Sequence, residues 1–481
     1  CKHIDLPLAS NSKQKQDTLN TSTVSYTDNK RHDYGGAWKA DISQLEEASH
    51  LIKGAPIKPV NRHITARMSK LKQKRLEELS ILEQDNPDLY LSDEEILRRD
   101  IPMNDSLLSN RNKEKLMAII LNNAKAFSLF GEVGKCDSSE VSITLQNDEP
   151  FFVRPFRYSE DDKLVIRREI QKMIAQGVLV KSPATHVSPV LLVKKKLDDG
   201  TMKYRIVVDF RTLNQKLLKP IYAQNLIQDA INKIGESGAK YISLIDLKEA
   251  YHALVLDKNS RKYTGVIPYY GHCSLTYQRL PMGLSISGAE FTNKILEILD
   301  KLPDYQDYCC NILDDLLIYS ETQEDHIKHM SNIIKLFNEE GLKISPKKTK
   351  VAQHKFSYMG YEITFNKAGL PVIKIEKSKV HAITQLSKPK TPKQVRSFIG
   401  MIQYLSRFLP RLNISLIPLY ELTKKTVPFK WTDKHQEIFE KLKEAVTTAP
   451  AVSLPTRTGI YILEIDSSRE GTGAVLKQMQ N

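Results

Sequence analysis

Two adjacent aspartates, Asp314 and Asp315, lie between short apolar runs in the stretch CCNILDDLLIYS. The flanking runs predict the two strands of a β-hairpin, which puts both like charges at its turn. A third aspartate, Asp246, ends the apolar run YISLID, and this run predicts another strand. Three carboxylates at the ends of apolar strands repel one another unless a cation lies among them. The pattern therefore favours a metal site built on a sheet.

Mg²⁺ prefers few carboxylates together with phosphate oxygens of a substrate. Two such ions, about 3.5–4 Å apart, can stabilise the attacking and leaving oxygens of a phosphoryl displacement. The three aspartates predict such a clamp. For each aspartate alone a structural interpretation stays open, because Asp-Asp is a good turn dipeptide and Asp246 can cap a helix that begins in LKEAY.

The chain is strongly basic, with 71 Lys and Arg against 57 Asp and Glu and a net charge of +14. Its 481 residues suffice for several compact domains. A positive balance of this size favours a polyanionic partner, because cationic side chains neutralise phosphates and release counterions.

The five cysteines show no zinc-ligand spacing, and the adjacent pair Cys309 and Cys310 is poorly placed to form a disulfide. We therefore expect a reducing, cytoplasmic location and no structural zinc. No apolar run approaches the ~18 residues of a membrane span, so no membrane association is expected. Because the chain begins at Cys1 rather than Met, we expect it to be part of a longer protein.

Helix and strand signals are interleaved without strict βαβ repeats, which predicts an α+β fold. Residues 1–60 are polar and predict a linker. Ser159 and Gly177 bound a firm helix, and Asp198-Asp199-Gly200 joins two β-rich runs as a hairpin. The remaining signals predict helices at 66–84, 112–130, 285–301 and 324–340, helices that begin at Thr391-Pro392 and Thr432, and a final strand pair around Asp466.

Several motifs follow one another in a fixed order: SPVLLVKKK, YRIVVDFRTLN, LIDLKEAYH, RLPMGLSISGAEF, ILDDLLIYS, GLKISPKK and YMGYEI. This set resembles the reverse transcriptase of gypsy-like LTR retrotransposons, with retroviral polymerases as more distant relatives. The resemblance runs from about Asn112 to the end and is most specific from Val187 to Tyr361.

The resemblance implies a right-hand polymerase with fingers, palm and thumb and an antiparallel palm sheet. A connection region and an incomplete RNase H-like α/β segment would follow. The implied boundaries are 1–60 for the linker, 61–150 for a helical N-terminal extension, 151–365 for fingers and palm, 366–455 for thumb and connection, and 456–481 for the RNase H-like start.

The resemblance also implies the activity, an RNA-directed DNA polymerase that adds dNTPs to a primer on an RNA or DNA template. Asp246, Asp314 and Asp315 would be catalytic and would hold two Mg²⁺ ions, with Mn²⁺ as an alternative, and the carbonyl of Leu247 would complete the metal shell. The other Pol domains, namely protease, RNase H and integrase, would belong to a longer polyprotein, and virus-like particles would be one intracellular location.

The resemblance implies that three residues contact the incoming nucleotide, two at its triphosphate and one at its sugar. Lys195 and Arg205 would bind its triphosphate, and Tyr251 would exclude a ribose 2′-hydroxyl. An exposed basic hairpin and a core tyrosine remain the structural alternatives for these residues.

Three further motifs are implied to act at the nucleotide, at the pyrophosphate and at the primer. Met282 and Gly283 would lie beneath the nucleotide, and Lys343 would donate a proton to pyrophosphate, although Lys347 and Lys348 are close in sequence. The primer-binding hairpin is implied to include Met359, Gly360 and Tyr361.

The sequence departs from the family pattern at Ile312, Ala253 and Gly288, where Tyr, Gln and Pro are usual. A decayed or domesticated palm that binds nucleic acid without synthesis therefore stays open, as does another class of palm polymerase. Asp466 resembles the first carboxylate of the RNase H domain, but a two-metal nuclease needs further acids. We expect no RNase H activity from these residues alone.

Overall fold

The computed structural model describes residues 91–196, 200, 202–219, 226–312, 314–409, 412–467 and 472–479. The predicted linker at 1–60 and the predicted helix at 66–84 lie outside these ranges. Within the described ranges, no helix is both long enough and apolar enough to cross a membrane.

A three-stranded antiparallel sheet, ordered β10–β11–β6, carries the three aspartates. Its strands are β6 (Tyr241–Asp246), β10 (Cys309–Ile312) and β11 (Asp315–Ser320). Both predicted strand runs and the hairpin between them are confirmed, since Ile312 pairs with Asp315. Successive side chains of β11 enter two different hydrophobic cores: Leu316 packs in one and Leu317 in the other. Because both faces of the sheet are buried, the strands are apolar throughout and show no polar alternation.

Helices on one side of this sheet confirm the predictions for 285–301 and 324–340. Thr322 starts the second of them, because its side chain accepts a hydrogen bond from the Asp325 amide at 3.1 Å. The helices around the sheet are α8 (Ile227–Glu236), α9 (Ala250–Ala253), α10 (Ser287–Leu299), α11 (Tyr305–Tyr308) and α12 (Gln323–Glu339).

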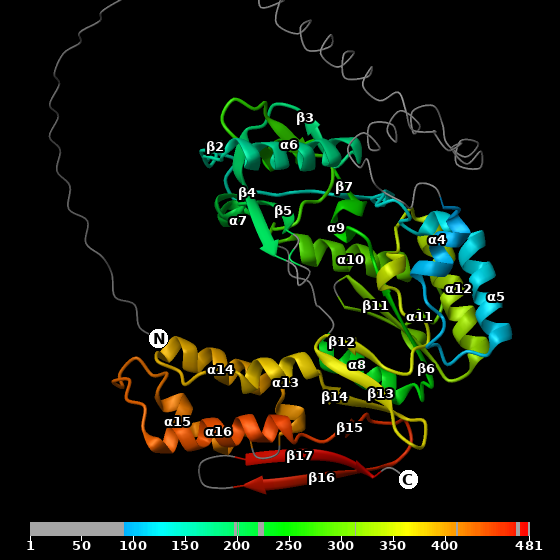
Figure 1. Cartoon of the computed structure of the whole chain (residues 1–481), viewed down its shortest axis with the longest axis vertical. Coiled ribbons are helices and arrows are strands. Elements are labelled where there is room, and N and C mark those ends of the chain that lie inside the picture. The colour runs from blue at the N-terminus through cyan, green and yellow to red at the C-terminus, as the bar shows by residue number, and fades with distance from the viewer. Residues whose placement is uncertain are drawn as a thin grey trace, which may run out of the picture. The chain divides into compact units, whose positions relative to one another are not determined.

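The described N-terminal part packs on α12 and is not entirely helical, in contrast to the prediction for 61–150 (Figure 1). The helix expected at 112–130 ends at Asn122, because the Asn123 side-chain amide donates to the Ile119 carbonyl at 2.8 Å and the chain continues as a short 3₁₀ turn. The elements are α4 (Asp93–Asp100), α5 (Asn110–Asn122), η2 (Ala124–Ala126) and β1 (Cys136–Val141), which pairs in parallel with β7 (Leu254–Leu256).

A six-stranded sheet with helix α6 (Glu160–Ala175) along it forms the region predicted as fingers (Figure 1). Ser159 caps α6 and Gly177 (φ +69°) follows its end, as predicted. The hairpin between β4 and β5 is confirmed, although Asp198 and Asp199 lie outside the described residues. The other bounds are β2 (Phe151–Phe152), β3 (Leu179–Lys181), β4 (His186–Lys196), β5 (Met202–Val208), α7 (Arg211–Lys216), η3 (Arg261–Thr264), β8 (Gly265–Ile267) and β9 (Leu275–Tyr277).

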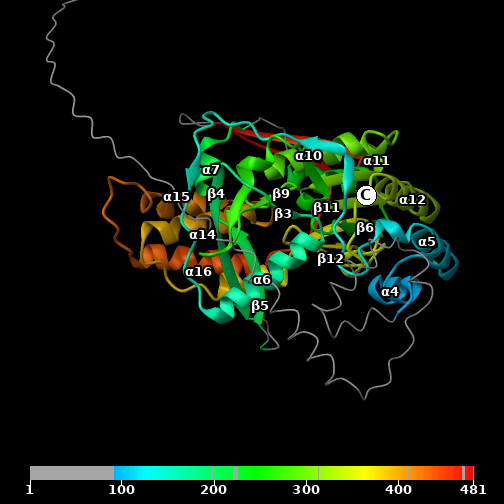
Figure 2. The same cartoon turned by 90° about the horizontal axis from the view of Figure 1, so that it is seen from above.

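A second core joins the sheet β12–β13–β14–β15 to five α-helices, one of which is α8. Thr391 and Pro392 begin α14 and Thr432 precedes α16, both as predicted. Figure 2 shows α14, α15 and α16 together, in agreement with their mutual contacts. The elements are η4 (Pro346–Lys348), β12 (Phe356–Tyr358), β13 (Tyr361–Phe365), β14 (Pro371–Ile375), α13 (Lys377–Thr384), α14 (Pro392–Tyr404), η5 (Ser406–Phe408), α15 (Leu412–Glu421), α16 (Asp433–Thr447) and β15 (Val452–Ser453).

The last described strands, β16 (Ile460–Ser467) and β17 (Thr472–Met479), confirm the predicted strand pair. In the described part of the chain they pair only with each other. Asp466 pairs with Gly473 in this hairpin.

Candidate active site

The antiparallel register brings the predicted catalytic aspartates together. Asp315, the first residue of β11, pairs directly with Asp246, the last residue of β6. Directly opposed residues of an antiparallel sheet share a face, with Cβ atoms about 4.5–5.5 Å apart. Asp314 occupies the turn, and its carbonyl accepts a hydrogen bond from the Leu247 amide at 3.3 Å. The turn is thereby tied to the chain that follows β6.

Negative charge is disfavoured at these carboxylates. Burial, followed by the charges of Asp246 and Asp314, raises the pKa of Asp315 to about 6. Burial and the Asp246 charge also raise the pKa of Asp314. One oxygen of Asp314, Oδ1, is buried without a hydrogen-bond partner. A cation placed among these groups would relieve both the repulsion and the unmet hydrogen-bonding capacity.

A lysine lies at this cluster in the structure. The ammonium of Lys348 is 2.9 Å from Oδ1 of Asp246, whose side chain is only 14% exposed. The backbone brings it there, because the Ser345 amide donates to the Asp246 carbonyl at 2.8 Å and Lys350 pairs with Leu244. The segment through η4 thus crosses the end of β6 and supplies a counter-ion.

The donor set fits a hard cation in chemistry, since it offers carboxylate oxygens and one of them has no partner. The side chains are not converged for chelation, because no three His, Cys, Asp or Glu side chains of the described ranges form a metal-binding group. Lys348 instead occupies one oxygen of Asp246. The predicted roles of Asp246, Asp314, Asp315 and the Leu247 carbonyl as metal ligands therefore remain predictions, with their backbone placement fixed by the sheet.

Tyr251 lies beside this cluster on α9. Its ring centroid is 5.3 Å from that of Phe291 on α10, and the side chain is half-buried. Burial, with the charge of Asp314, raises the pKa of Tyr251, which indicates a phenol close to the carboxylates. Gly288 lies opposite, since a Cβ built there would be 3.9 Å from the Tyr251 hydroxyl. The predicted exclusion of a ribose 2′-hydroxyl by Tyr251 remains a prediction.

Lys195 and Arg205 lie on one face of the β4–β5 hairpin. Lys195 pairs with Lys203 and Val193 with Arg205, so the two predicted cations are diagonal neighbours on the same face. The opposite face carries Lys194, whose ammonium is 2.6 Å from Asp162 of α6. The Lys195 and Arg205 side chains are exposed, and their contact with a triphosphate remains a prediction.

Met282 and Gly283 are held in a loop by a residue that the sequence motifs did not single out. The Asn214 amide donates to the Gly283 carbonyl at 3.0 Å, and its oxygen accepts from the Ser285 amide at 2.7 Å. Gly283 has φ +96°, and Met282 is 42% exposed. This loop is therefore tied to the segment after β5.

Two further residues lie near the aspartates, one given no role by the motifs and the other noted only as a sequence neighbour of Lys343. Glu249 has φ +47°, and its carboxylate is 3.4 Å from Nδ1 of His252, which lowers the pKa of Glu249. The other is Lys348, for which three nearby lysines gave no signal to choose. Lys343, the lysine predicted as proton donor, directs its ammonium to the Lys125 carbonyl. Its main-chain carbonyl accepts from Lys248 at 2.8 Å.

The predicted primer-binding residues form the turn between β12 and β13, since Tyr358 pairs with Tyr361 across Met359 and Gly360. Both turn residues have positive φ, +46° and +75°. The Tyr361 side chain is fully buried in the second core, so only its main chain is left for the predicted contact with a primer. The primer-binding roles of Met359, Gly360 and Tyr361 remain predictions.

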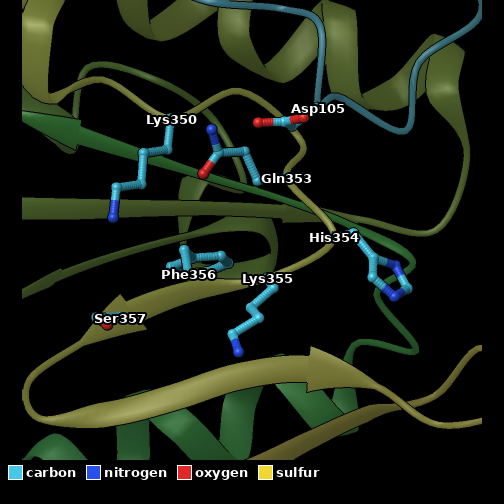
Figure 3. A pocket seen from close by; sticks show the side chains of 7 residues that line it. All are labelled: Asp105, Lys350, Gln353, His354, Lys355, Phe356 and Ser357. Carbon is cyan, nitrogen blue, oxygen red and sulfur yellow. The ribbon is translucent and has the colours of Figure 1, made fainter. Parts of the chain in front are cut away.

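A pocket of about 500 Å³ lies between the loop before α5 and the segment that precedes β12. Figure 3 shows Lys350, His354 and Lys355 around it, with Asp105 on the other segment. The Lys350 charge partly offsets the rise in the pKa of Asp315, so one lysine of this pocket lies close enough to act on the aspartates electrostatically.

The predicted RNase H-like residue Asp466 lies on β16 and is separate in sequence from this cluster. Among the departures from the family pattern, Ile312 and Ala253 are buried core residues. Each therefore has a packing role in this chain.

Comparison with known proteins assigns two parts of the chain. Residues 193–363 match the family model for reverse transcriptase (RNA-dependent DNA polymerase), and residues 431–481 match that for the RNase H-like domain found in reverse transcriptase.

Relatives of the chain are polyproteins. The Pol polyprotein from transposon 412 of Drosophila melanogaster is 28% identical over 341 residues, 70% of this chain and 27% of the relative. The transposon Tf2-7 polyprotein of Schizosaccharomyces pombe is 29% identical over 339 residues, 70% and 24% respectively. The Gag-Pol polyprotein of gibbon ape leukemia virus is 31% identical over 337 residues, 68% and 19%. The chain thus spans about a quarter or less of these relatives.

The fold is similar to that of foamy viral protease-reverse transcriptase. Its complex with double-stranded DNA matches with a TM-score of 0.68 at 23% identity, covering 81% of this chain and 66% of the other. The complex with RNA/DNA hybrid matches with a TM-score of 0.64 at 21% identity, covering 81% and 53%. The predicted fold class is confirmed. The chain therefore contains a region that matches reverse transcriptase at 193–363 and a segment that matches its RNase H-like domain at 431–481, and its relatives are retrotransposon and retroviral Pol polyproteins.

Proposed function

We propose that this chain is the RNA-directed DNA polymerase of an LTR retrotransposon of the gypsy-like type, adding dNTPs to a primer 3′ end. The pairing of Asp315 with Asp246, with Asp314 in the adjoining turn, carries the proposal. Such a cluster is chemically suited to phosphoryl transfer, where catalysis depends on positioning and on neutralising charge. The domain match at 193–363 encloses all three aspartates.

Two Mg²⁺ ions, with Mn²⁺ as a substitute, would be held by Asp246 and Asp314, with Asp315 and the Leu247 carbonyl completing the set. When bound, they would stabilise the attacking and leaving oxygens. The chain's own residues prepare this state, because the raised pKa values of Asp314 and Asp315 favour a bound cation over three bare charges. Lys348 would have to leave Asp246 Oδ1 before a metal bound there.

Lys195 and Arg205 would bind the nucleotide triphosphate from one face of the hairpin, and Met282 and Gly283 would lie beneath the nucleotide. Tyr251 would exclude ribonucleotides through its place beside Asp314. For the proton that pyrophosphate takes up, we favour Lys348 over Lys343, because Lys348 reaches the carboxylates and Lys343 is bonded to the Lys125 carbonyl.

The partners would be an RNA template, a DNA primer–template and dNTPs. A net charge of +14 supports this, as do the nucleic acids bound by the foamy viral enzymes of similar fold. The protein would act in the cytoplasm, including virus-like particles, within a polyprotein that supplies protease, RNase H and integrase.

Primer extension of oligo(dT) on poly(rA) with Mg²⁺ tests the proposal. We expect template-dependent DNA synthesis. A chain that binds this duplex tightly but adds no nucleotide would instead be a decayed palm, the alternative that Ile312, Ala253 and Gly288 left open.

A further inference from the structure

A lysine from α13 lies against the Met359–Gly360 turn. The ammonium of Lys379 is 3.9 Å from the ring centroid of Tyr404. A Cβ built on Gly360 would overlap this ammonium, so the missing side chain at Gly360 makes room for it. The cation therefore lies at the turn although it comes from another element.

Tyr404, at the end of α14, fixes this arrangement. Its hydroxyl donates a hydrogen bond to the Met359 carbonyl. Its ring stacks on that of Tyr361, with centroids 5.2 Å apart and planes 13° apart. The Tyr361 hydroxyl in turn donates to the Tyr404 carbonyl at 3.2 Å. The turn, β13 and α14 thus hold one another, and the Lys379 ammonium lies on this assembly.

Lys379 is half-buried and lacks a strong anionic partner. No carboxylate lies within ion-pair distance of it in the part of the chain that the structure describes, and Glu376, one turn earlier, acts only through a longer-range charge interaction. Burial lowers the pKa of Lys379. An ammonium kept over an aromatic ring and beside an open turn is chemically suited to an external anion such as a phosphodiester.

We propose that Lys379 binds a backbone phosphate of the primer strand near its 3′ end, and that Gly360 and Tyr404 position it for this contact. The inference rests on the proposed function and on the primer-binding role that the sequence resemblance implies for the Met359–Gly360 turn. The proposal adds a phosphate-binding residue from α13 to the turn, because the Tyr361 side chain of the motif itself is buried. If Lys379 only packed on Tyr404, its charge would make no difference to nucleic-acid affinity.

The test measures equilibrium binding of a DNA primer–template duplex without metal or nucleotide, so that synthesis is not required. Lys379→Met keeps a long apolar side chain over Tyr404 and removes the charge. Lys441→Met is the matched control, since Lys441 is 70% exposed and paired with Glu437 on α16. We expect Lys379→Met alone to reduce the slope of log affinity against log salt by about 0.9, the value of one phosphate contact.

A set of primers that each carry one neutral methylphosphonate near the 3′ end locates the contact. We expect one linkage whose neutralisation weakens wild-type binding about tenfold and leaves Lys379→Met unchanged. If every methylphosphonate weakened binding by Lys379→Met as much as it weakens binding by the wild type, the proposal would be overturned. The wild-type series needs no variant, so if Lys379→Met does not fold, the absence of any sensitive linkage still overturns it. A chain that shows the signature but adds no nucleotide would overturn the polymerase function and leave the Lys379 contact standing.

Discussion

Asp315 of β11 pairs directly with Asp246 of β6, and the ammonium of Lys348 is 2.9 Å from the Asp246 carboxylate. Two acids are therefore fixed on one face by backbone pairing, and a lysine from a third segment neutralises one of them. The proposed function depends on the charge balance at this point.

The raised pKa of Asp315 predicts how stability depends on pH in EDTA. Its folded-state pKa of about 6 lies above the ordinary value near 4, so the folded protein binds more protons between these values. The stability that protonated Asp315 contributes to the folded protein is therefore fully present below about pH 4, and it is lost as the pH rises through about 6. Asp315→Asn should remove this dependence and raise the free energy of unfolding at pH 7 by about 1–2 kcal/mol, after allowance for solvent screening.

Denaturant unfolding at pH 4.5 and pH 7 measures this effect. If the free energy of unfolding changed between pH 4.5 and pH 7 by the same amount in the wild type and in Asp315→Asn, the pKa of Asp315 would not be raised in the folded protein.

Lys348 should affect both the rate and the pH profile of extension. Lys348→Met should lower kcat by about 100-fold or more, because a proton donor is lost. It should also move the acidic limb of the pH profile to higher pH, because Lys348 holds down the pKa values of Asp314 and Asp315. The neighbouring Lys347→Met, 67% exposed, is the control and should behave as wild type. A larger effect from Lys343→Met than from Lys348→Met would return the role to Lys343.

Tyr251 should set sugar selectivity. Tyr251→Ala should raise incorporation of rNTPs relative to dNTPs by about 10- to 100-fold, because the clash with a 2′-hydroxyl disappears. Tyr251→Phe keeps the ring against Phe291 and should retain selectivity. Measured kcat/KM ratios for one rNTP and dNTP pair decide this, and equal ratios in wild type and Tyr251→Ala would assign the tyrosine to packing alone.

Affinity for a primer–template should depend strongly on salt and weakly on sequence. Because the protein would contact several phosphates, raising the salt concentration from roughly 50 to 200 mM should lower its affinity by about 100-fold or more. Two duplexes of unrelated sequence should bind alike, since backbone contacts carry no sequence information. A flat salt response would mean that the +14 net charge does not serve nucleic-acid binding.

Local sequence predicted the elements around the site well. The apolar runs beside Asp246 and Asp314 formed strands, and the predicted caps at Ser159 and Thr391 began helices, because these features depend on neighbouring residues. The helix at 112–130 was predicted too long, since the Asn123 side chain bonds back to the preceding turn.

The arrangement of the site could not be predicted from such local features. The choice of Lys348 over its neighbours depends on where the segment after α12 crosses β6, which the Lys350–Leu244 pairing fixes. Tyr361 belongs to a primer-binding motif by sequence, yet strand alternation turns it into the second core. Long-range pairing and burial decided both positions.

Primer extension by Asp246→Asn, measured beside duplex binding by the same protein, tests the central claim most directly. The change keeps the size of the side chain and its place opposite Asp315 but removes one anionic ligand. We predict that extension on poly(rA) with oligo(dT) falls by at least about 1,000-fold while duplex affinity changes less than about threefold. Near-wild-type extension by Asp246→Asn would contradict the assignment of these aspartates as the catalytic metal site.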